Sequence, residues 1–326
     1  MYNIIVYRKI PEFLLKRLKQ EFNVAYFEEI TKDNQKEFDE QLKKVHGLLG
    51  TGMKITKEIL DKAPDLRVIS NFSAGYDNLN LDELTKRGII ATNISDALTD
   101  TTADLIFGLL LSTARRITEL DRFVRKEKWE EEISKEYFGM DVHHKTIGII
   151  GMGRIGRAVA KRAALGFDMK VLYTKRNPDL EAEKELGAIH CDLNKLISNA
   201  DYICLTIPLT EETNYLINEK ELNKMKSTAV LINGGRGQLV CEEALIKALK
   251  KGTIRAAGLD VFEKEPLLKE SALLTIENVV MTPHIGSATE ETRNRMVAQG
   301  VDNLLQALNG EVPKNLLNPS VLISFK

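Results

Sequence analysis

The stretch Gly148-Ile-Ile-Gly151-Met-Gly153-Arg-Ile-Gly156 decides the fold class of this chain. It continues a short apolar run that begins at Thr146, and it opens into a segment whose apolar residues have helical spacing. An apolar strand, glycines at this spacing and an amphipathic helix together form the turn of a dinucleotide-binding βαβ unit. A glycine turn without a ligand is the structural alternative, but the complete strand–turn–helix frame favours a cofactor site.

Each glycine has a separate task in such a turn. Gly151 permits the tight bend, Gly153 lets the backbone approach a pyrophosphate, and Gly156 lets helix and strand pack closely. The amides of Arg154 and Ile155 stand at the start of the helix, where backbone N–H groups without helical partners bind anions. The sequence therefore predicts a pyrophosphate at this helix start.

The next strand, predicted over 171–174, runs directly into Lys175 and Arg176. Folds that bind NAD usually carry an Asp or Glu here, about 20 residues beyond the turn, to hold the ribose 2′-hydroxyl. A carboxylate would repel a 2′-phosphate, whereas two cations attract one. The basic pair favours NADP, with NAD possible, and a solvated pair of loop cations is the structural alternative.

Apolar runs of strand length alternate with amphipathic helical segments along most of the chain. In the first hundred residues the predicted strands are 4–7, 23–27, 47–51, 66–70 and 89–92. A second series is predicted at 147–150, 170–173, 202–205, 229–232, 256–259 and 279–281. Such alternation predicts an α/β fold with doubly wound parallel sheets that helices cover on both faces.

Two longer helices are expected beside these units. One begins at Thr101, whose hydroxyl would cap the free amides together with Asp104, and continues towards Arg125. Its length suits an element that links two domains, and a long core helix is the alternative. The last helix spans Thr289–Leu308 and runs into an Asn-Gly pair, residue types suited to a left-handed C-cap.

The composition excludes several classes of protein. With 326 residues, 43% apolar and 29% charged, the chain is long enough for two ordinary globular domains. A formal net charge of −1 provides no field that would favour nucleic acid or an anionic membrane. The first residues lack a signal-peptide pattern and the three scattered cysteines indicate reduced thiols, so we expect a cytoplasmic protein. No residues have the spacing of a metal site, because His143 and His144 lack a second ligand pair.

Three ionisable residues follow the glycine turn in distinctive settings. Arg236 lies in Asn-Gly-Gly-Arg-Gly, Glu265 in Asp-Val-Phe-Glu-Lys-Glu-Pro, and His284 in Thr-Pro-His-Ile-Gly-Ser-Ala-Thr. A cation, a carboxylate and an imidazole beside a nicotinamide dinucleotide are the groups that reduction of a 2-keto acid requires. The cation holds the substrate carboxylate, the imidazole exchanges the hydroxyl proton, and the acid tunes the imidazole.

Each of these residues also has an ordinary structural explanation. A histidine after proline is commonly a loop residue, and Arg236 is compatible with a loop cation. Glu265 stands in a charged segment, where Glu263 is the obvious wrong choice of carboxylate. The joint occurrence of the three, in this order after a glycine turn, favours the catalytic interpretation.

These motifs are similar to those of the D-2-hydroxyacid dehydrogenases, and within that family to the glyoxylate/hydroxypyruvate reductases and 2-ketogluconate reductases. The resemblance covers essentially the whole chain. Its marks are residues 71–78, 101–104, 151–156, 208–210, 233–237, 260–266 and 283–289. One departure is Cys241, where the family often has an acid before Glu242; it lies outside the three ionisable residues.

The resemblance implies a role for each motif. Arg236 would bind the substrate carboxylate and polarise the keto oxygen, and His284 would protonate that oxygen as hydride reaches C2. Glu265 would bond the other imidazole nitrogen and keep the ring protonated near neutrality. The amides of Ala74 and Gly75 would hold the other carboxylate oxygen.

The resemblance also implies the cofactor contacts and the domain order. Besides the glycine turn and the basic pair, the cofactor would contact Thr102, Thr206, Pro208, Thr213, Gly234, Gly235 and Asp260. Asp260 would lie beside the nicotinamide, whereas a capping role alone would explain Thr102. A Rossmann cofactor domain, residues 100–289, would be inserted into a flavodoxin-like substrate domain made of 1–99 and 290–326. A homodimer through the long-helix side is implied too, and residues 129–141 would close the pocket, reach a partner subunit or pack in the core.

We therefore expect NAD(P)H-dependent reduction of a small 2-keto acid, such as glyoxylate or hydroxypyruvate, to the D-2-hydroxy acid. Two rival functions stay open. One is a phosphoglycerate- or D-lactate-type dehydrogenase, although nothing in the chain resembles an appended regulatory domain. The other is a dinucleotide-sensing scaffold like the related transcriptional corepressors, which keep the three ionisable residues but carry disordered tails that are absent here. The sequence leaves the choice of keto acid open.

Overall fold

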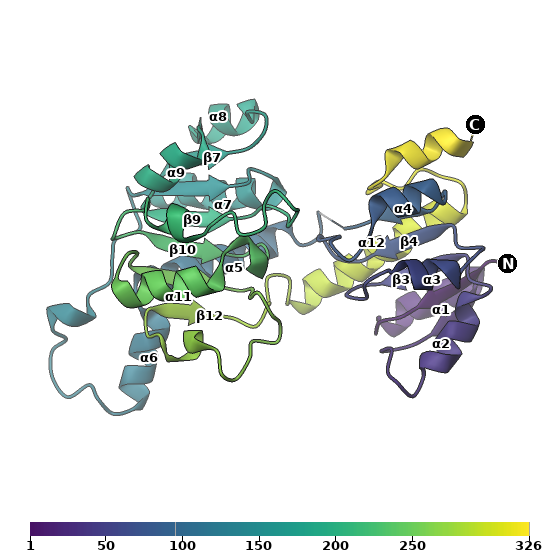
Figure 1. Ribbon diagram of the computed structural model, residues 1–326, viewed down its shortest axis with the longest axis horizontal. Coiled ribbons are helices and arrows are strands. Elements are labelled where there is room, and N and C mark those ends of the chain that lie inside the picture. The colour runs from purple at the N-terminus through teal and green to yellow at the C-terminus, as the bar shows by residue number, and fades with distance from the viewer. Residues whose placement is uncertain (95, 326) are drawn as a thin grey trace. The chain divides into compact units, whose positions relative to one another are not determined.

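The structure, a computed structural model, describes residues 1–94 and 96–325. The chain divides into two compact units: Met1–Leu98 with the segment from Ala288 onward, and Thr99–Ser287. The polypeptide leaves the first unit once and returns to it after completing the second (Figure 1). Each unit has its own sheet and its own core.

The first unit contains a parallel five-stranded sheet in the order β2-β1-β3-β4-β5. Its strands are β1 (Asn3–Val6), β2 (Asn23–Tyr26), β3 (Gly47–Gly50), β4 (Val68–Asn71) and β5 (Ile90–Thr92). Its helices are α1 (Glu12–Glu21), α2 (Gln35–Leu42), α3 (Lys57–Asp61), α4 (Leu81–Lys86) and α12 (Glu290–Leu308), with the 3₁₀ helix η4 (Pro319–Phe325). The chain places β2 on one side of β1 and then adds β3, β4 and β5 on the other side, which is the flavodoxin-like strand order.

Alternating side chains of these strands face two separate layers. Ile5, Leu48 and Ile69 point into a core shared with α2, where Phe38 is buried. On the other face α12 packs against β3 and β4, and Ser70 donates a 2.7 Å hydrogen bond to a carbonyl of α12. The unit is therefore a sheet between two helical layers, as the doubly wound pattern predicts.

The second unit contains a parallel seven-stranded sheet in the order β12-β11-β10-β9-β6-β7-β8. Its strands are β6 (Thr146–Ile150), β7 (Lys170–Thr174), β8 (Ile189–His190), β9 (Tyr202–Leu205), β10 (Val230–Asn233), β11 (Ala256–Leu259) and β12 (Val279–Met281). Its α-helices are α5 (Thr99–Ala114), α6 (Ile117–Arg125), α7 (Arg154–Phe167), α8 (Leu180–Leu186), α9 (Leu193–Asn199), α10 (Glu219–Leu222) and α11 (Glu242–Lys251). The 3₁₀ helices are η1 (Lys135–Tyr137), η2 (Gly237–Leu239) and η3 (Ala272–Thr275). The six strands from β8 to β11 have the Rossmann order and β12 is added at the edge beside β11, so the predicted fold class is confirmed.

Residues of α5 and α7 share one core of this unit with Ile147 and Ile149. Residues of α9, α10 and α11 share a second core, on the opposite face, with Leu231 and Ala257. Because strand side chains alternate between faces, the near-continuous apolar runs seen in the sequence are those of strands buried on both sides.

The predicted single helix from Thr101 to Arg125 is wrong in two respects. Helix α5 begins at Thr99, so Thr101 lies inside the helix and is not its cap. The helix ends at Ala114, and α6 starts only after Arg116, which adopts a left-handed conformation (φ 56°, ψ 33°). Apolar residues keep helical spacing across the break, so periodicity alone could not reveal it.

The last helix, α12, is confirmed; the structure adds an N-cap at Thr289, and the glycine of the expected C-terminal Asn-Gly pair is left-handed. The Thr289 hydroxyl accepts the N–H of Thr292, and Gly310 takes the left-handed conformation (φ 82°) just beyond the helix end. Across residues 1–94 and 96–325, none of the helices combines the length and the apolar character that a bilayer crossing needs.

Candidate active site

The glycine turn between β6 and α7 has the backbone geometry of a pyrophosphate site. Gly151 has a φ of +102°, in the region that strains any side chain. Gly153 immediately precedes the helix, so the amides of Arg154 and Ile155 belong to its first turn. A Cβ at Gly153 would meet no atom within 4 Å, which leaves room for a ligand beside the turn. These residues therefore fit a dinucleotide.

Two glycines of helix α7 provide a test of this turn: Gly156 lies against the turn, and Gly166 is the control. A Cβ on Gly156 would lie 2.1 Å from the carbonyl oxygen of Gly151, whereas a Cβ on Gly166 would meet no atom within 4 Å. We expect Gly156→Ala to destabilise the fold by about 1–3 kcal/mol, because helix and turn must separate. Gly166→Ala should instead be neutral or stabilise by up to about 1 kcal/mol. Thermal denaturation measures both, and equal melting temperatures would contradict the expectation.

Three neighbouring strands bring the ionisable residues to one edge of the second sheet. β10, β11 and β12 are adjacent and parallel, so their carboxyl ends share an edge. Arg236 lies three residues after β10, Glu265 six residues after β11, and His284 three residues after β12. The glycine turn leaves the carboxyl end of β6, which is parallel to the same strands. Open α/β sheets bind their ligands at this edge.

His284 and Glu265 form a hydrogen-bonded pair. Nδ1 of His284 lies 2.7 Å from Oε2 of Glu265, whose Oε1 accepts the N–H of Phe262 at 3.1 Å. Burial opposes ionisation of Glu265, but the hydrogen bonds from His284 and Phe262 and the charges of His284 and Arg236 together lower its pKa below the usual value. The carboxylate is therefore ionised at neutral pH. With Nδ1 engaged, Nε2 is the ring nitrogen left to exchange a proton with a substrate.

Asp260 shapes the loop that carries His284. Its side chain is 2% exposed, and its carboxylate accepts bonds from the Thr282 hydroxyl (2.6 Å) and from the N–H groups of Ile285 (2.8 Å) and Gly286 (2.9 Å). His284 has a φ of +53°, uncommon for a residue other than glycine, and its N–H bonds to the Asp260 carbonyl at 2.9 Å. Asp260 thus positions the imidazole through the backbone. Its contact with a nicotinamide stays a prediction.

Arg236 lies in a loop packed directly against the segment that carries Glu265. The buried side chain of Asn233, at the end of β10, donates to the Arg236 carbonyl at 2.9 Å. A Cβ on Gly237 would lie 1.9 Å from the carbonyl carbon and oxygen of Phe262, so only glycine fits there. Burial raises the pKa of Glu265; the hydrogen bonds from His284 and Phe262 and the charge of His284 lower it, and the charge of Arg236 adds a smaller lowering contribution. The structure therefore brings all three predicted catalytic residues together.

Two further carboxylates join the same segment to α11. Glu263 accepts the N–H of Glu242 at 2.7 Å, and Glu242 accepts the N–H of Glu263 at 3.4 Å. Cys241, at the N-cap of α11, makes no side-chain cap bond, so Glu263 supplies the acceptor at this helix start. Glu263 therefore has a structural task, which separates it from the catalytic candidate Glu265.

The predicted cofactor residues after β9 form a compact loop beside the glycine turn. The Thr206 hydroxyl donates to the Gly151 carbonyl at 2.7 Å, which ties the loop to the turn. The Thr213 hydroxyl donates to the Pro208 carbonyl at 2.8 Å and accepts the N–H of Thr210 at 2.7 Å. Their placement suits a cofactor cleft, but contact with the cofactor stays a prediction.

Close packing against neighbouring residues explains the residue types at Thr102, Gly234 and Gly235. A Cβ on Gly286 would lie 3.3 Å from the Thr102 methyl group, so α5 supports the loop that carries His284. A Cβ on Gly234 would lie 2.4 Å from Ile106 of α5, and one on Gly235 would lie 2.8 Å from Leu239. Close packing explains the two glycines without a ligand, and cofactor binding by the three residues stays a prediction.

The amides expected to bind the substrate lie in the first unit, in the loop after β4. The Ala74 carbonyl accepts the Asn93 side chain at 2.7 Å, and the Ser73 carbonyl accepts the N–H of Ile94 at 3.1 Å. A trans peptide directs its N–H opposite to its C=O, so the N–H groups of Ala74 and Gly75 point away from these partners. The two N–H groups are therefore directed away from Asn93 and Ile94, and their binding of a carboxylate stays a prediction.

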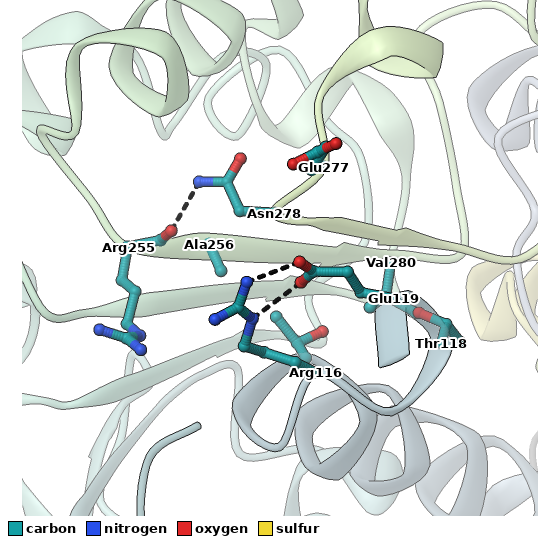
Figure 2. Close-up of a pocket in the computed structure, with 9 residues that line it drawn as sticks. Arg116, Thr118, Glu119, Arg255, Ala256, Glu277, Asn278 and Val280 are labelled. Atoms are coloured by element: carbon teal, nitrogen blue, oxygen red, sulfur yellow. Dashed lines mark hydrogen bonds and ion pairs between the residues drawn. The ribbon is translucent and has the colours of Figure 1, made fainter. Parts of the chain in front are cut away.

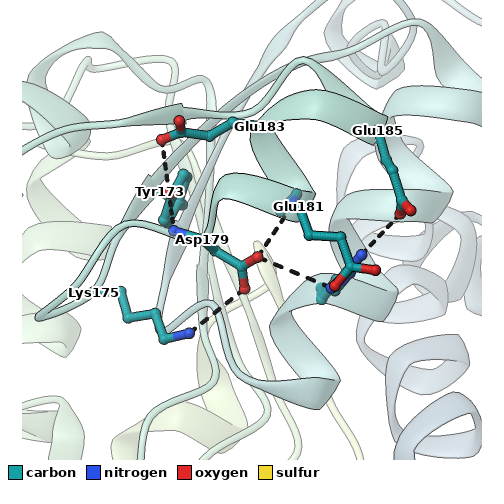
Figure 3. A network of polar contacts seen from close by, with 8 residues as sticks. Tyr173, Lys175, Asp179, Glu181, Glu183 and Glu185 are labelled. Atoms are coloured by element: carbon teal, nitrogen blue, oxygen red, sulfur yellow. Dashed lines mark hydrogen bonds and ion pairs between the residues drawn. The ribbon is translucent and has the colours of Figure 1, made fainter.

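The basic pair lies between β7 and α8, and Figure 3 shows that one member is already engaged. Nζ of Lys175 lies 3.5 Å from Oδ2 of Asp179. Arg176 is exposed; a hydrogen bond from Thr210 lowers the pKa of Glu212, and the charge of Arg176 adds a smaller contribution. Binding of a cofactor phosphate by Lys175 and Arg176 stays a prediction.

Comparison with known proteins decides the family. A family model described as "D-isomer specific 2-hydroxyacid dehydrogenase, NAD binding domain" matches residues 107–286. Glyoxylate/hydroxypyruvate reductase B of Yersinia pestis (strain Pestoides F) is 52% identical over 322 residues, covering 99% of both chains. The chain belongs to the D-isomer-specific 2-hydroxyacid dehydrogenases. The family expected from the motifs is thereby confirmed.

Solved structures of this dehydrogenase family match along nearly the whole chain. An NADPH-dependent glyoxylate/hydroxypyruvate reductase from Sinorhizobium meliloti, in complex with NADP and malonate, has a TM-score of 0.85 and 32% identity, covering 98% of this chain and 97% of its own. A glyoxylate reductase from Paecilomyes thermophila has a TM-score of 0.88 and 30% identity, with coverages of 97% and 98%.

The dehydrogenase also has a cavity of about 380 Å³ away from this site. Figure 2 shows Arg116 paired with Glu119 beside residues at the amino-terminal ends of β11 and β12. Ala256 begins β11 and Asn278 precedes β12, so the cavity lies at the sheet edge opposite the ionisable residues. Catalytic chemistry is therefore not expected there.

Sequence reasoning missed several residues that hold the dehydrogenase site together. Asn93 fixes the loop after β4 by donating to the Ala74 carbonyl, and an asparagine with such a task carries no motif of its own. Asn233 belongs to the Asn-Gly-Gly-Arg-Gly motif, but the motif does not reveal its bond to the Arg236 carbonyl. The Glu242–Glu263 contact joins residues 21 positions apart, and only the absence of a capping side chain at Cys241 hints at it.

Proposed function

We propose that this protein reduces glyoxylate or hydroxypyruvate to the D-2-hydroxy acid, with NADPH as the preferred reductant and NADH as a possible one. The observation that carries the proposal is the His284–Glu265 pair, with Arg236 close by, at the sheet edge where the glycine turn begins. The relatives named glyoxylate/hydroxypyruvate reductase support the choice of substrates.

The three residues divide the chemistry between them. Arg236 binds the substrate carboxylate through its guanidinium fork and polarises the keto oxygen. Protonated His284 donates the proton from Nε2 to that oxygen, and the ionised Glu265 stabilises the imidazolium through Nδ1. The nicotinamide, when bound, supplies the hydride to C2. The amides of Ala74 and Gly75 hold the second carboxylate oxygen, so the first unit serves as the substrate domain.

Cofactor preference is the part of this proposal that Lys175 and Arg176 carry. Replacing both by alanine should raise the KM for NADPH by about 10–100-fold, because charged hydrogen bonds to a phosphate contribute about 1.5–3 kcal/mol. The KM for NADH should change little, since NADH has no 2′-phosphate. Steady-state kinetics with both cofactors makes the comparison, and equal losses for NADPH and NADH would sink the phosphate-binding role.

We also propose that the protein is a homodimer through α6 and the loop over residues 126–141. Figure 1 shows this loop extending away from the body of its unit. It carries exposed apolar side chains, with Trp129 62% and Phe138 55% accessible, and Ile117 at the start of α6 is 54% accessible. Exposed apolar side chains gathered in one segment mark a protein interface, and the complementary surface is the same segment of a second copy.

Sedimentation velocity tests the homodimer. The wild type should sediment with the mass of two chains, and Phe138→Asp should shift it towards one, because a buried charge at an interface costs several kcal/mol. Leu165→Asp is the control, since Leu165 is 64% exposed on α7 outside this segment. A wild type that sediments as one chain at every concentration would overturn the homodimer.

A further inference from the structure

The loop that carries the basic pair has its own counter-charge. Asp179 follows Lys175 by four residues and has only 16% of its side chain exposed. Its Oδ2 lies 3.5 Å from Nζ of Lys175, while Oδ1 accepts the N–H of Ala182 at 3.1 Å and so caps α8. One carboxylate therefore closes the loop and begins the next helix (Figure 3).

Asp179 cannot easily move away from this position. Its own N–H donates to the Tyr173 hydroxyl at 2.6 Å, and that hydroxyl donates to Glu183 at 2.9 Å. Tyr173 is fully buried in the core beneath the loop, so it anchors the backbone of Asp179 from below. The carboxylate is a fixed feature of the site and not a mobile surface group.

Arg157 is a second cation near Asp179, but other carboxylates hold it. Arg157, on α7, is held by Glu181 and by Glu185 at 2.8 Å, and its closest approach to Asp179 is 3.9 Å. Figure 3 shows Asp179 between Lys175 and this cluster of charges. A 2′-phosphate at Lys175 must therefore compete with Asp179 for the ammonium group, and it meets the negative charge of Asp179 as it does so.

We propose that Asp179 limits the preference of this enzyme for NADP, because its carboxylate holds Lys175 in an ion pair that the 2′-phosphate of NADP has to displace. The inference rests on the proposed role of Lys175 in binding that phosphate. Asp179 moderates the preference for NADP and leaves NAD usable, since NAD carries a hydroxyl where NADP carries the phosphate. Asp179 is thus a specificity-determining residue outside the basic pair itself.

The test is Asp179→Asn, which removes the charge and keeps the structure. Asparagine caps helices about as well as aspartate, so the bond to Ala182 and the backbone bond to Tyr173 are retained. The KM for NADPH should fall by about 2–5-fold, the size expected for an exposed ion pair, and the KM for NADH should change less than about 1.5-fold. The gain should shrink at high salt, because salt screens such charges.

Asp192→Asn is the matched control. Asp192 caps α9 with a 2.9 Å bond to Lys195, so it makes the same charge change at the same kind of helix position. It should leave the ratio of NADPH to NADH efficiency unchanged. An equal gain in Asp192→Asn, or no gain in Asp179→Asn, would overturn the inference.

Lys175→Ala distinguishes the inference about Asp179 from the proposal that Lys175 binds the 2′-phosphate. If Asp179 acts by holding Lys175, adding Asp179→Asn to Lys175→Ala should produce less than half of the gain seen in the wild-type background. A full gain without Lys175 would contradict the competition. If Lys175→Ala lowers NADPH efficiency selectively while Asp179→Asn has no effect, only the present inference fails. If Lys175→Ala leaves the ratio unchanged, the phosphate-binding role of Lys175 fails and the inference fails with it.

Discussion

Replacing His284 by alanine is expected to lower kcat for keto-acid reduction by about 10²–10⁴-fold, the usual contribution of a positioned proton donor. The KM for NADPH should stay within about 2-fold of the wild type, because the glycine turn and the basic pair are untouched. Asp260 holds the backbone N–H groups of His284, Ile285 and Gly286, so the loop should keep its conformation without the imidazole.

The measurement for His284→Ala is NADPH oxidation under saturating cofactor, with a parallel fluorescence titration of NADPH binding. His143→Ala serves as the control, because His143 is exposed in the loop before β6 and lies outside every proposed site. If His284→Ala retained more than about a tenth of wild-type kcat, another group would have to donate the proton.

Glu265→Gln is expected to lower kcat for reduction by about 10–100-fold, because it replaces a charged hydrogen bond to the imidazole with a neutral one. The effect on the KM for the keto acid should be smaller. The amide oxygen can still accept the N–H of Phe262, so the loop should fold as before, and the amide NH2 then faces Nδ1. The substitution therefore removes the carboxylate charge and the acceptor oxygen beside Nδ1.

The dependence on pH separates an electrostatic role of Glu265 from a structural one. The pKa of Glu265 is lowered in the folded protein. The stabilisation from its ionised carboxylate is therefore complete above the ordinary glutamate pKa of about 4.3. That stabilisation is lost as the pH falls through the lowered pKa. A low-pH limb of the pH–rate profile for reduction should therefore follow protonation of Glu265 in the wild type and be absent from Glu265→Gln. The same limb in both enzymes would refute the electrostatic role.

The sequence predicts the sheets well because their information is local. The glycine turn and the apolar runs specify strands and their parallel connections, since a βαβ unit needs only a strand, a turn and an amphipathic helix in succession. The sequence also predicts that Arg236, Glu265 and His284 lie at one edge of the sheet, because each follows a parallel strand of that sheet.

Contacts between distant loops could not be predicted in the same way. The break at Arg116 depends on side-chain contacts with Glu119 and with the ring of Tyr137, 21 residues further along the chain. Lys175 pairs with Asp179, an acid that lies just beyond the segment in which an acid was sought, so this loop is less positive than the basic pair alone indicates. Secondary-structure propensity and hydrophobic periodicity do not predict which acidic side chain will pair with which basic one.

The most direct measurement is the initial rate of the wild-type enzyme with glyoxylate and with hydroxypyruvate, each with NADPH and with NADH. We expect fast oxidation of NADPH with at least one of the two acids, and slower turnover with NADH. Turnover with NADH alone would contradict the role of the basic pair while leaving the His284–Glu265 chemistry in place. No turnover with either acid would contradict the proposed function, and longer 2-keto acids and a dinucleotide-sensing scaffold would then be the alternatives to test.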